Sequence, residues 1–161
     1  MSFEKLEKKE TWLFDLDNTL YSPDIGIFSQ IDERMKKFIS LKLGITEQKS
    51  FLLQKKFYKK YGTTLYGLIK HYQIDPEEFC NYVHDINLKN LKSSKSLKIK
   101  LQTLPGRKII YTNADYNYAE RVLESLGIKE VFSDIFDIRK SNYLPKPMKT
   151  SINKVIKQCE L

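Results

Sequence analysis

The chain has 161 residues and a formal net charge of +8 at pH 7. This length supports one hydrophobic core and excludes a string of independent domains, so we expect one folding unit. A basic balance suits phosphate and other small anions as ligands. Nucleic acid is disfavoured as the anion, because the sequence contains no zinc-finger spacing, basic zipper or ribonucleoprotein motif.

The two cysteines, Cys80 and Cys159, are far apart and outside any metal-ligand pattern. This usage predicts a reduced, cytoplasmic protein in which neither cysteine is catalytic. The charged first ten residues do not lead into the apolar stretch of a secretion signal. No window approaches the ~20 apolar residues of a membrane span, so we expect no membrane partner.

Three apolar runs predict short buried strands, and the run after the second has helical periodicity with Gly127 as its stop. The helix places Tyr118, Val122, Leu123 and Leu126 on one face. A strand, helix, strand unit of this kind predicts a parallel α/β sheet, with ligands bound beyond the carboxyl ends of its strands. The expected strands are Trp12–Asp15, Lys108–Thr112 and Asp134–Ile138.

The segment between the first two strands is far longer than the ~30 residues of one strand, helix, strand unit. We therefore expect a helical cap inserted at residues 21–97, with residues 1–20 and 98–161 forming the core. Asp75 and Pro76 have the pattern of a helix start. A lysine-rich stretch, LKNLKSSKSLKIK, is interpreted as a solvated return to the core, with steering of an anion as the alternative. One apolar helical stripe is expected to hold Phe28, Ile31, Met35, Phe38 and Ile39.

Asp15 and Asp17 stand at the end of the first strand, with Leu16 between them pointing back to the core. Two carboxylates at one turn suit Mg²⁺, which binds through one or two carboxylates, carbonyl oxygen and substrate phosphate. A carboxylate there can attack phosphorus and form an aspartyl phosphate. The alternative is that both aspartates only cap a turn.

Three stretches in chain order carry further information: FDLDNTL, IIYTNAD with Thr112 at a strand end, and YLPKPMK with Lys146 between prolines. Together they resemble the first three motifs of the haloacid dehalogenase-like (HAD) superfamily. Six stretches, two of which overlap those just named, resemble its pyrimidine 5′-nucleotidase-like branch: YGTTLYGL, DPEEF, YVHDI, IYTNAD, RVLESLGI and FSDIFDIRKSNYLPKP. The resemblance implies a Rossmann-like core with an inserted helical cap, Mg²⁺ as cofactor, and hydrolysis of small phosphomonoesters such as nucleoside 5′-monophosphates.

The resemblance also implies roles for five residues. Asp15 corresponds to the nucleophile and a magnesium ligand. Asp17 corresponds to the general acid and base and offers the metal its backbone carbonyl. Thr112, with Asn113 beside it, would bind the phosphoryl oxygens, and Lys146 would balance charge on the phosphoaspartate.

Other polar residues are left open. Tyr61, Thr63 and Thr64 either face the site or serve as helix ends, with Thr64 a possible cap. His71 and His84 have no Cys, Asp or Glu at metal-ligand spacing, so we expect them to be structural or surface residues.

The family pattern includes a fourth motif, an acidic pair on a later strand, and this sequence reaches Leu161 before it. Two explanations stay open, a truncated chain and an edge supplied by another chain. The first strand would then be an open edge, so we expect the chain either to be marginally stable and aggregation-prone or to self-associate through that edge. The alternative to the phosphatase is an impaired remnant that binds phosphate ligands or a partner chain.

Overall fold

Three parallel strands form the centre of the computed structural model, which describes residues 10–161. They are β1 (Thr11–Phe14), β2 (Arg107–Tyr111) and β3 (Asp134–Phe136), in the order β1-β2-β3. The register sets Leu13 opposite Ile109 and Ile110 opposite Ile135. The predicted α/β class with a Rossmann-like parallel sheet is confirmed.

Each strand ends one or two residues earlier than predicted, and this leaves the polar residues on the turns that follow. After β1, the backbone N–H groups of Thr19 and Leu20 both donate to the carbonyl of Leu16, at 3.3 and 3.0 Å. The chain therefore turns over residues 16–20, and Asp15 lies just beyond the end of the strand.

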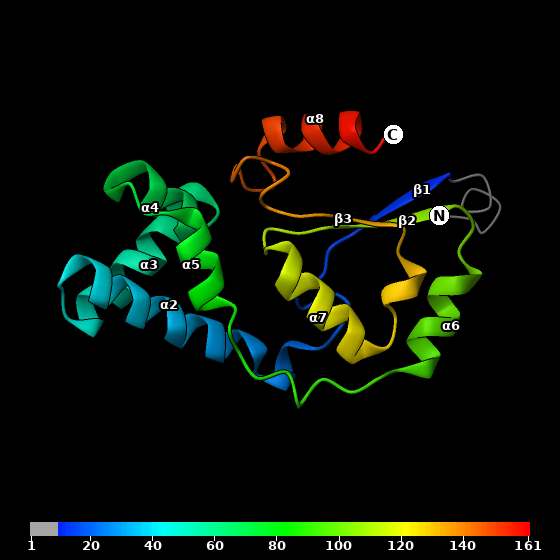
Figure 1. Ribbon diagram of the computed structural model, residues 1–161, viewed down its shortest axis with the longest axis horizontal. Helices are drawn as coiled ribbons and strands as arrows, with labels where there is room; N and C mark the ends of the chain where they lie inside the picture. Colours follow the sequence, from blue (N-terminus) through cyan, green and yellow to red (C-terminus); the bar gives the residue numbers. More distant parts are fainter. Residues whose placement is uncertain (1–9) are drawn as a thin grey trace.

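Helices cover both faces of the sheet (Figure 1). α7 (Tyr116–Leu126) joins β2 to β3, begins at the Asp115 cap and ends at Gly127, where φ is +67°. Its predicted inner face is buried as expected. α8 (Lys149–Gln158) lies on the opposite face, where Val155 and Cys159 pack on Ile109 and Phe136.

Helix α8 carries four apolar residues at the spacing of one helical face, Ile152, Val155, Ile156 and Cys159, and the expectation that all four are buried is only half right. Ile152 and Ile156 are 37% and 44% exposed, whereas Val155 and Cys159 are buried. Ile152 lines the pocket described below, and Ile156 is left exposed.

Helices α2 to α5 pack on one another beside the sheet, and we call them the α2–α5 unit (Figure 1). Asp75 caps α5 and Pro76 opens it, as predicted. Phe28 was predicted on the buried stripe of α2 but is 40% exposed, because it faces the pocket described below. The bounds are α2 (Ile27–Leu43), α3 (Glu47–Tyr61), α4 (Thr64–Tyr72) and α5 (Pro76–Val83).

The lysine-rich stretch was expected to be a solvated connection back to the core. Only its first half is irregular, because its second half begins helix α6 (Lys95–Thr103). Ser94 caps this helix and Leu101 is buried, while Lys95 and Lys100 are exposed. Two short 3-10 turns complete the fold, η1 (Pro23–Ile25) and η2 (Lys129–Val131). Within residues 10–161, none of the helices is long and apolar enough to cross a membrane.

Candidate active site

Asp15 and Thr112 lie at the same edge of the sheet, because each directly follows one of two paired parallel strands. Asp15 is 47% exposed and forms an ion pair with the ammonium group of Lys146. The hydroxyl of Thr19 donates to its other oxygen at 3.1 Å. One carboxylate oxygen therefore faces a fixed cation, and the side chain remains open to a ligand.

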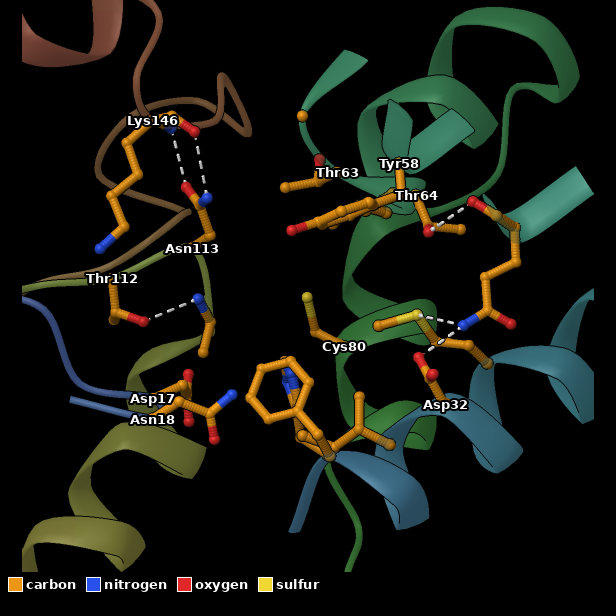
Figure 2. A pocket seen from close by; sticks show the side chains of 18 of the residues that line it. Asp17, Asn18, Asp32, Tyr58, Thr63, Thr64, Cys80, Thr112, Asn113 and Lys146 are labelled. Carbon is orange, nitrogen blue, oxygen red and sulfur yellow. Dashed lines mark hydrogen bonds between the residues drawn. The ribbon is translucent and has the colours of Figure 1, made fainter. Parts of the chain in front are cut away.

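Lys146 reaches this edge from the loop that follows β3, and Asn113 holds that loop (Figure 2). The Asn113 amide donates to the Lys146 carbonyl at 3.2 Å and accepts from its backbone N–H at 2.8 Å. The Lys146 ammonium also donates to the Tyr111 carbonyl at 2.5 Å. Asn113 thus positions Lys146, in addition to lining the pocket.

Thr112 is 2% exposed, and its hydroxyl oxygen accepts from the backbone N–H of Ala114 at 3.0 Å. Its own N–H donates to Phe136 at 3.1 Å, which ties the residue to β3. Because the hydroxyl oxygen is an acceptor in this turn, its hydrogen is left to donate to a ligand.

Asp17 is half-buried and accepts two hydrogen bonds at the same oxygen, from Tyr21 at 2.6 Å and Tyr118 at 2.8 Å. Burial raises the pKa of the Asp17 carboxyl above its ordinary value, against the opposing effect of the two tyrosine hydroxyls. The sequence did not point to either tyrosine, since Tyr118 was expected only as a core residue of α7.

A pocket of about 960 Å³ lies between this edge of the sheet and the α2–α5 unit. Thr63 and Thr64 line it, whereas Tyr61 is not in its wall and contacts His71 at 2.5 Å. Thr63, not Thr64, is the cap of α4. Within the described residues, the amide oxygen of Gln54 is a buried acceptor without a partner in this wall.

His84 also lines the pocket, so its expected role as a structural or surface residue was incomplete. The expectation that no suitable neighbour accompanies it was wrong: potential ligand atoms of Cys80, His84 and Asp115 lie within 4.8 Å of one another. Cys80 and His84 are four residues apart at the end of α5, a spacing that places them on one helical face. Asp115 comes from α7, so no local pattern reveals the cluster.

The edge of the sheet presents oxygen donors suited to a hard cation. Asp15 offers an accessible carboxylate, and in the described part of the chain no donor reaches the backbone carbonyl of Asp17. Carboxylate and carbonyl oxygens are the protein ligands that Mg²⁺ prefers. An accessible carboxylate, a lysine and a threonine hydroxyl at one point can together bind and attack a phosphoryl group.

Comparison with known proteins agrees with this α/β fold and carboxylate site. The family model of haloacid dehalogenase-like hydrolases matches residues 10–161. The chain therefore belongs to the HAD-like hydrolases.

Two known proteins are similar to this chain. Phosphate metabolism protein 8 of Saccharomyces cerevisiae is 28% identical over 137 residues, which are 79% of this chain and 43% of that protein. The chain thus spans less than half the length of this relative. The HAD-hydrolase YfnB from Bacillus subtilis, crystallised with magnesium, has a TM-score of 0.50 and 18% identity, over 92% of this chain and 72% of YfnB. At that identity the likeness concerns the fold alone.

Proposed function

We propose that the chain is a magnesium-dependent phosphomonoester hydrolase that acts through an aspartyl phosphate on Asp15. The observation that carries this proposal is the meeting of an accessible Asp15, the Thr112 hydroxyl turn and the Lys146 ammonium group at one edge of the sheet. Membership of a hydrolase family and a relative named for phosphate metabolism support the same chemistry.

The reaction needs two transfers at phosphorus. The Asp15 carboxylate attacks phosphorus while the P–O bond to the leaving group breaks, and the leaving oxygen takes a proton from Asp17. Water then attacks the same phosphorus and gives a proton to Asp17, while the P–O bond to Asp15 breaks. This second transfer releases inorganic phosphate and restores the Asp15 carboxylate. Thr112 donates to a phosphoryl oxygen and Lys146 balances negative charge. The Asp15 carboxylate and the Asp17 backbone carbonyl would hold Mg²⁺, which would neutralise part of the negative charge of the phosphate.

For the substrate we infer a nucleoside 5′-monophosphate or a similar small phosphate, as in the pyrimidine 5′-nucleotidase-like branch. The pocket volume of about 960 Å³ exceeds what a phosphate group alone requires and suits an organic leaving group. The unpaired amide oxygen of Gln54 is an acceptor for an amino or hydroxyl group of that substrate. The α2–α5 unit would act as the cap that selects it.

Asp15→Asn tests the nucleophile. We expect a loss of at least ~10³-fold in turnover of cytidine 5′-monophosphate with Mg²⁺, because an amide is a far poorer nucleophile than a carboxylate. Asp24→Asn, at an exposed aspartate of η1, is the matched control and should hydrolyse the substrate at the same rate as the parent. Equal rates for Asp15→Asn and the parent would remove Asp15 from the mechanism. A parent that binds phosphate but shows no turnover would favour the non-catalytic alternative.

A further inference from the structure

His84 is a pocket residue for which the proposed reaction has no role. It follows α5, its side chain is 13% exposed, and it lines the pocket together with Asp17 and Cys80. The guanidinium of Arg121 in α7 donates to the carbonyl of His84 at 3.2 Å and to that of Ile86 at 2.7 Å. The backbone that carries His84 is therefore fixed to the core.

Two contacts fix the orientation of its ring. Nδ1 bonds the carboxylate of Asp115, the residue that caps α7. The ring also stacks on Tyr118, with centroids 4.6 Å apart and planes at 20°. The same Tyr118 donates its hydroxyl hydrogen to Asp17 at 2.8 Å. The imidazole is thus separated from Asp17 by a single aromatic side chain.

The other ring nitrogen, Nε2, is the one left for a ligand. Because the Asp115 carboxylate can only accept, Nδ1 carries a hydrogen. In the described part of the chain, no side chain or backbone group bonds Nε2. A histidine anchored by a carboxylate at Nδ1 is a common way of presenting Nε2 to a ligand in a defined direction.

A metal ion fits this cluster poorly, although Cys80 and Asp115 lie nearby. One Asp115 oxygen bonds His84, and the other accepts from the Tyr118 N–H at 3.1 Å with the Arg139 guanidinium at 3.5 Å. A cation would displace these donors and lie beside Arg139. The Cys80 thiol is 1% exposed, and burial raises its pKa well above the ordinary range.

We propose that His84 is a substrate-contacting residue, which donates Nε2–H as an imidazolium to an anionic phosphoryl oxygen of the phosphomonoester. The Asp115 carboxylate bonds Nδ1 on one side of the ring, and the Arg139 guanidinium lies beyond it, 3.5 Å from the other Asp115 oxygen. Thr112 and Lys146 would contact the phosphoryl group from the core, while His84 contacts it from the end of α5. This inference rests on the proposed function for its ligand.

Nitrogen NMR of the imidazole rings tests the contact without requiring turnover. The chain contains only two histidines, so His71→Gln assigns both sets of signals. Titration with inorganic phosphate and Mg²⁺ should shift the Nε2 signal of His84 and leave that of His71 unchanged. Phosphate binding that is detected by calorimetry without a shift at His84 would overturn the contact.

Kinetics on cytidine 5′-monophosphate supply the second readout. His84→Gln keeps a neutral donor and loses the charge, so we expect KM to rise about 10-fold, the size of one charge-assisted hydrogen bond. The control His71→Gln should match the parent. A His84→Gln protein that is less stable but has an unchanged KM would show a structural role and refute the proposal.

The proposed phosphatase activity and the proposed His84 contact can be refuted independently of each other. Turnover in the parent with no His84 shift and no KM change leaves the phosphatase standing and refutes the contact. A phosphate-induced His84 shift without any turnover supports the contact and removes the hydrolase. Absence of both phosphate binding and turnover refutes both.

Discussion

At the scale of single residues, the sequence revealed the groups that carry charge and missed the groups that position them. Asp15, Thr112 and Lys146 follow recognisable strand ends and a proline-flanked loop, so their meeting at one edge was predictable. Tyr118 and Asp115 were not, because each acts on a partner 101 or 31 residues away. The packing of α7 against the turn after β1 brings Tyr118 to Asp17, and its packing against the end of α5 brings Asp115 to His84.

The buried Asp115 makes stability depend on pH in a defined direction. Burial alone would raise its pKa, but the hydrogen bond and charge of His84 hold the pKa below its ordinary value. A carboxyl group with a lowered folded-state pKa stabilises the fold above its unfolded pKa of about 3.9, and this contribution is lost as the pH falls through the folded-state value.

Asp115→Asn isolates this contribution, since asparagine is also a good helix cap. We expect the substitution to lower the free energy of unfolding by ~1–3 kcal/mol at pH 7. The difference from the parent should shrink below pH 4. Urea denaturation of both proteins at pH 7, 5 and 3 measures it. A difference that stays constant with pH would assign the loss to packing alone.

At the scale of elements, helix starts, helix stops and strand runs were predictable because they depend on local chemistry. The Asp75 cap and the Gly44, Gly62 and Gly127 stops follow from side-chain acceptors and positive φ angles. Which apolar residues of a helix are buried was less predictable. Phe28 and Ile152 both line the pocket and stay partly exposed, and this outcome depends on what lies opposite each helix.

Gly67 in α4 illustrates the same limit. Alanine usually stabilises a helix relative to glycine by ~0.5–1 kcal/mol. Here a β-carbon would lie 2.4 Å from Cγ of Phe57 in α3, so the helices would have to separate. We expect Gly67→Ala to destabilise the fold by ~1–3 kcal/mol.

Urea melts of three variants test this expectation. Lys70→Ala, at an exposed position of the same helix, is the control for helix propensity and should change stability by less than ~0.5 kcal/mol. In a double variant with Phe57→Ala, the cost of the new β-carbon should fall, because Cγ and the rest of the clashing ring are absent. A stabilising Gly67→Ala would mean that α3 and α4 adjust freely.

At the scale of the whole molecule, the sheet has an open side. β1 is the edge strand in the order β1-β2-β3, and in the described residues it pairs only with β2. Leu13 is 41% exposed and opposes Ile109, which packs beneath α8. Leu13 therefore lies on the α8 side of the sheet, where Ile152 and Ile156 are also exposed. An unpaired strand edge with an apolar face is a template for pairing with another chain.

We propose that two copies associate through β1, since a two-fold axis lets the same edge serve both. Leu13→Lys places a charge on that edge and should shift the mass measured by light scattering from dimer toward monomer, while leaving the melting temperature at low concentration within a few degrees. Leu41→Lys, at a 74% exposed leucine of α2, is the control and should dimerise like the parent. A parent that remains monomeric up to ~1 mM, where a weak pairing should still be seen, would exclude association through this edge.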